Sequence, residues 1–222
     1  MSGNWDFRLV LANLDFLIEG FIGTLKIASV SLVFGVLMGF VFAALRMSKY
    51  RIISVPTSCV IEFLRMTPLL VQLFWVYFAL PVVLGIRLDA FTAGAITFSL
   101  QNGAFFGEVF RGGIQSIDVS QWEGARALGM RRFQLMRRVI LPQAIRRMLP
   151  PLLERSFELI KGTTQMAVVA YGDLLYNSMV LSTRLYRPVE VLTTVAAFYL
   201  VFLTALSLII RYVEHRFDAR QA

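Results

Sequence analysis

The chain has 222 residues, of which 57% are hydrophobic and 16% are charged, whereas soluble domains carry roughly 25% charged residues. This composition indicates an integral membrane protein and excludes a soluble domain. The formal net charge of +8 is interpreted as a mark of cytoplasmic loops rather than of nucleic-acid binding, because basic residues concentrate in such loops.

Several kinds of site are excluded by number. The chain has one cysteine, Cys59, and one histidine, His215, so neither an internal disulfide nor a zinc site of Cys and His ligands can form. No G-x-x-x-x-G-K-[ST] loop occurs, so no nucleotide site is expected. The first residues lack the pattern of a cleaved signal peptide, and the first span is expected to serve as the targeting signal.

Five membrane-spanning helices are predicted, because a span needs about 20 mostly apolar residues. Uncharged runs for four of them lie at residues 27–45, 66–86, 90–107 and 191–210. The first two helices are expected to begin earlier, near Ile18 and Ser54. The fourth span in chain order lies within residues 148–183 and carries charged side chains, so its polar side should face protein or water.

Basic residues orient these spans, because cytoplasmic loops are rich in Lys and Arg. The segments after the first, third and fifth spans are the basic ones, and residues 111–147 alone contain eight Arg and two acidic residues. The N-terminus is therefore expected outside and the C-terminus, with Arg220, in the cytoplasm. Since the other loops are short, we expect a single transmembrane domain over residues 1–222 with one large cytoplasmic loop at about 111–147.

Glycines recur at four-residue spacing in two of the spans, at Gly35 and Gly39 and at Gly103 and Gly107. Such pairs allow two helix backbones to approach closely. The pattern fits ordinary packing between helices of this chain, and it also fits a contact with another subunit.

The large basic loop is patterned as two short helices. Ser120 and Glu123 fit a capping box that would start the first helix, and Gly129 is placed to end it, because glycine tolerates the left-handed conformation found there. Residues 131–141 form the second helix, and Pro142 interrupts it or begins the next turn. A small, smooth helix suits insertion into a groove on a partner protein; an amphipathic helix lying on anionic lipid is the alternative left open.

The loop resembles a known motif. E-G-A-R-A-L-G, followed by I-L-P at residues 140–142, is similar to the EAA loop of ABC importer permeases: Glu123, Ala125 and Gly129 match, and Gly124 replaces the usual Ala. Three further segments are similar to those of the polar amino-acid permeases, so the resemblance covers nearly the whole chain. They are E-F-L-R-M-T-P-L-L-V-Q at residues 62–72, E-V-F-R-G-G-I-Q-S-I at 108–117 and G-F-I-G-T-L at 20–25.

The resemblance implies an all-α integral membrane protein with five spans, the permease subunit of an ATP-driven amino-acid importer in the prokaryotic inner membrane. It implies a second permease chain, identical or related, two ABC ATPase subunits that bind ATP and Mg²⁺, and a periplasmic or extracellular solute-binding protein. The chain itself is expected to bind membrane lipid but no cofactor, metal or nucleic acid, and not to be an enzyme. The alternative is an ion-gradient-driven secondary transporter of small polar solutes, which would usually show internal repeats and ionisable groups at mid-span.

The resemblance also implies which residues carry the function. The residues expected to couple the chain to the ATPase are Glu123, Gly124, Ala125, Ala127, Leu128 and Gly129. Near the end of the fourth span the chain departs from the family segment L-K-D-T-S-L, with Gly162 in place of the Asp and Gln165 in place of an apolar residue. Candidate residues of the substrate pathway are Glu158, Thr163, Thr164, Gln165 and Gln72.

Three charged residues on one face of the fourth span have two readings. Glu154, Glu158 and Lys161 share that face by helical spacing. They form either a solvated or mutually paired surface, or a site in which Glu158 helps to select a cationic or zwitterionic substrate.

Overall fold

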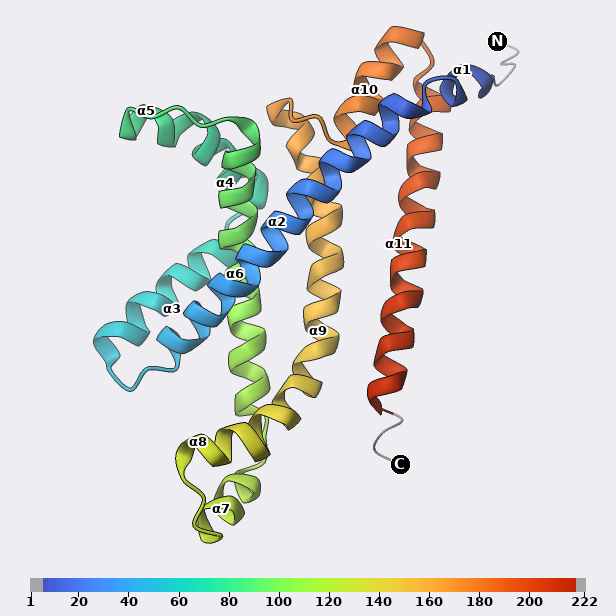
Figure 1. Cartoon of the computed structure of the whole chain (residues 1–222). Helices are drawn as coiled ribbons and strands as arrows, with labels where there is room; N and C mark the ends of the chain where they lie inside the picture. Colours follow the sequence, from blue (N-terminus) through green and yellow to red (C-terminus); the bar gives the residue numbers. More distant parts are fainter. Residues whose placement is uncertain (1–5, 219–222) are drawn as a thin grey trace. The chain divides into compact units, whose positions relative to one another are not determined.

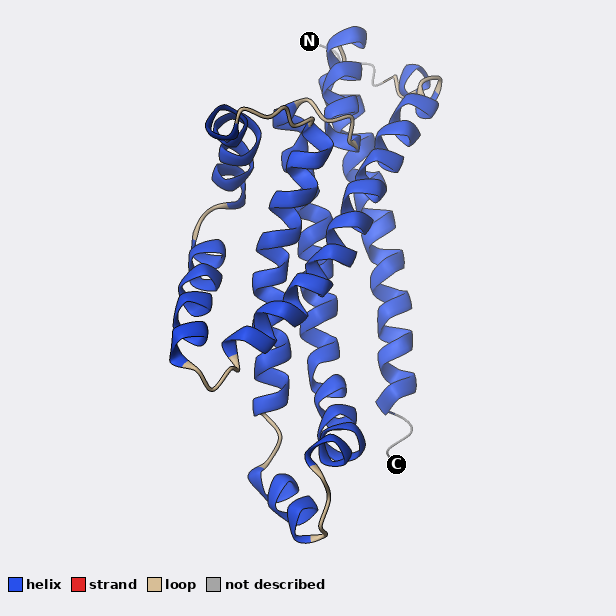
Figure 2. Cartoon of the chain, turned by 60° about the vertical axis from the view of Figure 1, so that its left-hand side comes forward, coloured by secondary structure: helices blue, strands red, loops and turns tan. Residues whose placement is uncertain are grey.

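The computed structural model describes residues 6–218, and within this range the chain is helical, without strands (Figures 1 and 2). The predicted all-α class is therefore confirmed for the described residues. Arg220 of the predicted basic tail lies outside them.

The helical elements follow one another along the chain with short connections. In order they are α1 (Arg8–Leu11), α2 (Leu14–Arg46), α3 (Arg51–Met66), α4 (Leu69–Phe74), the π-helix η1 (Trp75–Ala79), α5 (Leu80–Leu84), α6 (Ala90–Gln115), α7 (Val119–Ala127), α8 (Arg132–Leu135), the π-helix η2 (Met136–Ile140), α9 (Leu141–Gly162), the 3-10 helix η3 (Thr163–Val169), α10 (Leu174–Leu185) and α11 (Pro188–Asp218).

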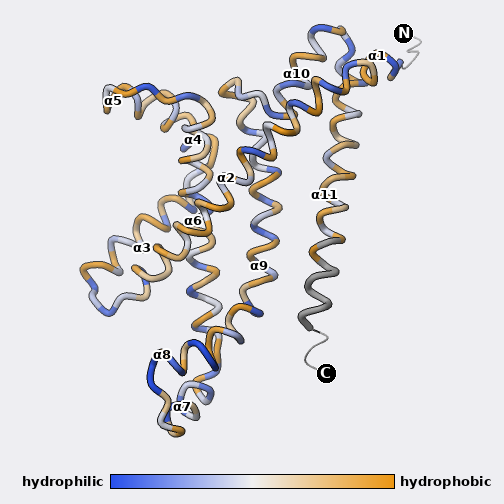
Figure 3. Tube along the Cα trace, in the orientation of Figure 1, coloured by the Kyte–Doolittle hydropathy of each residue, from blue (hydrophilic) through white to orange (hydrophobic). Residues whose placement is uncertain are grey.

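Two described helices are long and apolar enough to cross a membrane, namely Leu14–Arg46 of α2 and Pro188–Leu208 of α11. Counting Arg51–Met66 with Leu69–Leu84 as one broken span gives up to three. Figure 3 shows long hydrophobic stretches along α2 and the described part of α11. The count of five spans and their orientation therefore remain predictions.

Two of the predicted spans are not continuous helices. The second is broken between α3 and α4, where Thr67 has an extended backbone with φ −82° and ψ 134°. Pro68 causes this break, because a proline ring disfavours the helical conformation of the residue before it. The fourth is divided into α9, η3 and α10, and the helix tightens to 3-10 geometry immediately after Gly162.

Two other prolines are accommodated by a widened helical turn just before them. The N–H of Leu80, next to Pro81, bonds to the carbonyl of Trp75, and the N–H of Leu141, next to Pro142, bonds to that of Met136. These are π-type bonds across five residues. A proline lacks an N–H and clashes with the carbonyl four residues earlier, so the wider turn lets the helix continue. Pro142 thus begins a new turn rather than ending the helix.

The chain forms two compact units whose boundaries fall within α2, α6 and α9 and between α3 and α4. The first comprises Met1–Ser31, Leu69–Thr97 and Phe157–Ala222, and the second comprises Leu32–Pro68 and Phe98–Ser156. The core of the first unit is formed by Val10, Leu17, Leu174, Leu181, Val191 and Val195. The prediction of one transmembrane domain stays a prediction.

In the first unit, the start of α10 packs closely against α2. A Cβ atom at Gly23 would lie 2.2 Å from the carbonyl oxygen of Gly172. The hydroxyl of Tyr171 donates to the carbonyl of Gly23 at 3.1 Å, and the N–H of Leu174 donates to the hydroxyl of Thr24, also at 3.1 Å. These contacts give a packing role to the segment at residues 20–25.

In the second unit, α2 and α6 approach each other through the glycine pairs that the sequence singled out. A Cβ at Gly39 would lie 2.7 Å from the Cβ of Phe106, and one at Gly107 would lie 2.9 Å from the Cβ of Phe42. Gly103 is equally close to Met38. The glycines therefore serve packing within this chain, which was one of the two interpretations.

Ion pairs join the ends of three helices in the same unit. The segments at 62–72 and 108–117 each contain an E-x-x-R sequence, and Glu62 lies 3.6 Å from Arg65 while Glu108 lies 2.7 Å from Arg111. Arg46, the last residue of α2, contacts Glu108 and lies 3.5 Å from Glu62. The guanidinium of Arg46 thus links α2 to both α3 and α6.

The glycine contact can be tested by adding a single methyl group. Gly39→Ala should destabilise the protein by about 1–3 kcal/mol, because the new Cβ overlaps the rigid Cβ of Phe106. Gly112→Ala, in α6, is the matched control: no atom lies within 4 Å of its Cβ position, so the melting temperature in detergent should stay equal or rise slightly. Equal melting temperatures for the two variants would contradict the close helix contact.

Candidate functional site

The first helix of the basic loop is capped by Asp118 and not by the predicted capping box. The Asp118 carboxylate accepts a hydrogen bond from the backbone N–H of Ser120 at 2.8 Å, and α7 begins at Val119, which makes Ser120 its second residue. This hydrogen bond lowers the pKa of Asp118 below its ordinary value. The carboxylate is therefore ionised at neutral pH, and its stabilising effect is lost only as the pH falls through that lowered pKa.

Gly129 ends this helix as predicted, in a Schellman motif. Its φ is +71°, and its N–H donates to the carbonyl of Arg126 while the N–H of Met130 donates to that of Ala125. The two bonds satisfy carbonyls that the helix end would otherwise leave without partners. Ala125 and Met130 also pack in the same apolar cluster, so the turn after α7 is fixed on both sides.

The predicted coupling residues divide between two faces of α7. Ala125 is only 5% exposed and belongs to the core that includes Leu135, Ile140 and Ala144. The others, namely Glu123, Gly124, Ala127, Leu128 and Gly129, are exposed, Leu128 to 79%. Ala125 therefore anchors the helix to its own chain, and the exposed residues provide the surface that a partner can contact. The sequence alone did not separate these two roles.

The candidate pathway residues lie where α9 becomes η3, apart from Gln72, which is buried in α4. Thr163 is buried and its hydroxyl donates to the carbonyl of Ile160 at 2.7 Å. The Thr164 hydroxyl likewise donates to its own helix, at Lys161. The Oε1 atom of Gln165 is buried and has no hydrogen-bond partner among the described residues.

Two of the three residues on the charged face of α9 are paired with each other. Lys161 donates to Glu158 at 2.9 Å, and both side chains are 53% exposed. Glu154 is exposed as well. An exposed pair of this kind contributes little to stability, and it leaves Glu158 with a cation already beside it.

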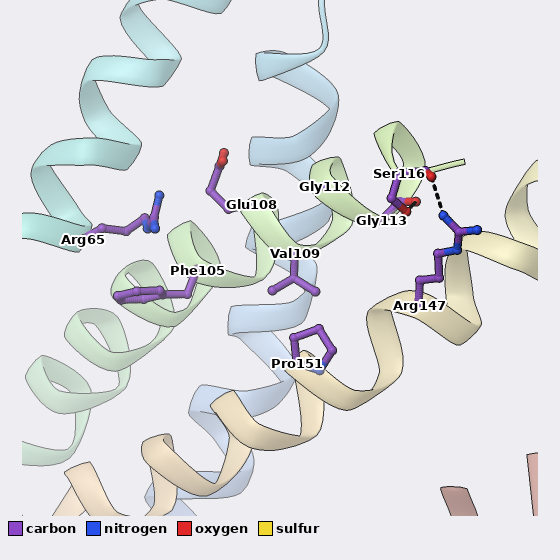
Figure 4. A pocket seen from close by; sticks show the side chains of 9 residues that line it. All are labelled: Arg65, Phe105, Glu108, Val109, Gly112, Gly113, Ser116, Arg147 and Pro151. Carbon is purple, nitrogen blue, oxygen red and sulfur yellow. Dashed lines mark hydrogen bonds between the residues drawn. The ribbon is translucent and has the colours of Figure 1, made fainter. Parts of the chain in front are cut away.

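A pocket of about 500 Å³ in the second unit was not predicted from the sequence (Figure 4). Arg65 of α3, Arg147 of α9, and Phe105 and Glu108 of α6 are among its lining residues. Glu108 is already paired with Arg46 and Arg111, and Arg147 donates to the carbonyl of Ser116. The only sequence signal for this region was the similarity of segments 62–72 and 108–117 to family segments.

The described residues contain no group of three or more His, Cys, Asp or Glu side chains that could hold a metal ion.

A family model described as the binding-protein-dependent transport system inner membrane component matches residues 31–221. The chain belongs to this family. The resemblance found in the sequence is therefore confirmed, and the protein is an inner-membrane transport component.

Individual relatives agree with this family. The chain is 34% identical to a putative glutamine transport system permease protein, GlnP, of Rickettsia bellii, over 90% of this chain and 92% of the relative. It is also 34% identical to a probable glutamine ABC transporter permease protein, GlnM, of Bacillus subtilis, over 95% and 97%. A chain from a crystal structure of an amino acid ABC transporter with histidines matches with a TM-score of 0.91 at 35% identity, covering 97% of this chain and all of the other.

These similarities decide between the two classes of transporter. The relatives named above are permease subunits of binding-protein-dependent or ABC systems, and none is a gradient-driven transporter. The chain is accordingly a permease subunit and not an enzyme. The secondary-transporter alternative finds no support.

Substitutions at Gly129 test whether the turn requires a residue that tolerates the left-handed conformation. Gly129→Val should open the end of α7, because a left-handed backbone costs a non-glycine residue about 1–2 kcal/mol, and a β-branched residue is especially disfavoured there. Gly129→Asn should retain most of the turn. Hydrogen exchange of the Gly129 and Met130 amides measures this, with at least fivefold faster exchange expected at Met130 in the Val variant. Gly124→Ala, at an open position of the same helix, serves as the control, and equal exchange in all variants would rule out the strained turn.

Proposed function

We propose that this chain is the membrane-spanning subunit of an ATP-driven importer of polar amino acids. The observation that carries the proposal is the loop helix α7, which has a small, uncharged exposed face and a fixed glycine turn where the family has its EAA motif. The amino-acid systems named among its relatives support the substrate class. The chain forms the solute path, and ATP and Mg²⁺ are bound by separate ATPase subunits.

Coupling runs from the exposed face of α7 to the core of the second unit. Gly124, Ala127 and Leu128 enter a groove on the ATPase, which suits a helix with small side chains, and Glu123 lies at the edge of this contact. Ala125 joins α7 to the buried side of η2 and α9. Because packed cores transmit displacement rather than absorb it, movement of the groove moves α9 and α6 as well.

The solute path includes the end of α9 and the 3-10 helix η3. Seven residues of 3-10 helix are an unusually long run, and such runs often mark functional hinges. The buried Gln165 Oε1, which lacks a partner among the described residues, supports Gln165 as a solute contact more strongly than Thr163 or Thr164, whose hydroxyls are bonded to their own helix. Glu158 has the weakest support, since it is exposed and paired with Lys161; Gln72 remains a further candidate.

The complete transporter contains two permease chains, identical or related, two ATPases and a solute-binding protein outside the membrane. In this chain five spans place the N-terminus outside and the C-terminus in the cytoplasm. The spans are α2, the region on both sides of Pro68, α6, α9 and α11. The basic loop from α7 to the start of α9 then lies on the cytoplasmic side, where it meets the ATPases.

Reconstituted transport tests the function directly. The permease, its ATPase and its binding protein are placed in proteoliposomes, and uptake of a panel of labelled amino acids that includes glutamine is measured. Uptake should require internal ATP and the binding protein, stop with vanadate, and persist when a protonophore removes the proton gradient. Uptake driven by a proton gradient without ATP would instead establish a secondary transporter.

Cysteine labelling tests the orientation. In a Cys59→Ser background, single cysteines replace Leu128 or Tyr186, which are 79% and 89% exposed. A membrane-impermeant maleimide should label Tyr186→Cys on intact spheroplasts and Leu128→Cys only after the membrane is opened. The reverse pattern would invert the proposed topology, and labelling of both on intact spheroplasts would remove it.

A further inference from the structure

The loop and the start of α9 carry a concentration of positive charge that lies outside the proposed ATPase contact of Gly124, Ala127 and Leu128. Residues 124–153 contain seven Arg and no acidic residue. Five of these arginines lie on α8, η2 and the first turns of α9 or directly before them, and we call them the arginine belt. They are Arg131, Arg132, Arg137, Arg138 and Arg146.

The belt arginines are available for a ligand. All five side chains are exposed, and among the described residues none forms an ion pair with an acidic group: the ion-paired arginines are Arg46, Arg65, Arg111 and Arg187. The neighbouring Arg147 differs, because it donates to the carbonyl of Ser116. Five like charges within residues 131–146 that have no ion-pair partner repel one another, which favours an anionic partner.

Exposed apolar side chains lie among these charges. Phe133 is 72% exposed and Ile145 is 52% exposed, while Leu135, Ile140 and Ala144 on the opposite side are buried in the core. The outer face of this helical run therefore combines arginines with large apolar groups. This combination is typical of helices that lie at the boundary between lipid headgroups and acyl chains.

The position of α8 relative to α7 and the long helices also bears on what the belt can contact. Figures 1 and 2 show α7 at the far end, with α8 on the side of the long helices α6 and α9, and Figure 3 shows α8 as a hydrophilic segment. Arg146 lies two residues before Met148, where the stretch of the predicted fourth span begins. In the proposed topology the belt arginines border the fourth span, which places them close to the membrane surface on the cytoplasmic side.

We propose that the arginine belt binds the phosphate headgroups of anionic phospholipids in the cytoplasmic leaflet. Guanidinium groups pair with phosphate oxygens in a bidentate manner, and basic segments next to a span are attracted to anionic lipid. Phe133 and Ile145 insert at the level of the glycerol groups. The inference rests on the cytoplasmic placement of the loop, which the cysteine labelling tests separately.

Lipid retention provides the decisive measurement. The purified transporter complex in detergent is titrated with phosphatidylglycerol or phosphatidylcholine, and bound lipid is counted by native mass spectrometry. The Arg137→Gln/Arg138→Gln variant should bind phosphatidylglycerol roughly tenfold to thirtyfold more weakly than the wild type, since each arginine near the surface contributes about a fivefold attraction. Binding of phosphatidylcholine should not change. Unchanged phosphatidylglycerol binding in this variant would overturn the proposal.

Two controls separate charge, folding and partner. Arg8→Gln/Arg87→Gln removes two exposed arginines from the opposite side of the proposed topology and should leave lipid binding unchanged. Arg137→Lys/Arg138→Lys keeps the charge and should restore most of it. The ATPase should co-purify equally with all variants; loss of the ATPase together with normal lipid binding in the Gln variant would assign the belt to a protein partner instead and refute the lipid proposal.

Discussion

The close approach of α2 and α6 at Gly39 and Gly107 is the contact on which the second unit depends. It brings the two backbones together where a side chain at either glycine would overlap a neighbouring Cβ. Arg46 lies about two helical turns beyond Gly39, and Glu108 is the residue after Gly107, so the same approach sets the distance over which these two side chains pair. Arg46 also pairs with Glu62 of α3. The close packing of α2 and α6 at the glycines therefore positions the arginine that links α3 to them.

The end of α6 leads directly into the loop, so the position of α7 follows from the same packing. Ala125 and Met130 join the core that contains Phe106 and Phe110 of α6. The loop helix is therefore part of the packed unit and not a separate appendage. Coupling by displacement requires such packing. A movement imposed on α7 at Leu128 displaces α6 and α9 only if no flexible segment between them absorbs it. The capping bond of Asp118 and the turn at Gly129 stiffen the two ends of α7 where such a segment would otherwise form.

Features that depend on local chemistry were predictable from the sequence, and features that depend on tertiary partners were not. The long apolar runs predicted α2 and α11, and Gly129 predicted the left-handed turn, because each follows from a property of the residues themselves. The break at Thr67 also had a local signal in Pro68, but the uncharged run around it outweighed that signal. The N-cap residue is Asp118 and not the predicted Ser120. Both residue types can cap a helix, and the backbone geometry of the preceding turn decides which of them does.

The burial of Ala125 shows this limit most clearly. Gly124, Ala125 and Ala127 differ little in hydropathy, so periodicity cannot say which of them is buried. The core residues Leu135, Ile140 and Ala144 decide it, and they come from a later part of the chain.

The polar side chains at the end of α9 differ in the free energy that it costs to keep them in their surroundings. A buried acceptor without a partner costs about 1–3 kcal/mol, and structures keep such groups rarely and often for function. Gln165 Oε1 is such a group among the described residues, whereas Glu158 and Lys161 form an exposed pair that any two opposite charges could replace. The unsatisfied amide oxygen of Gln165 therefore ranks first among the candidate residues of the proposed path.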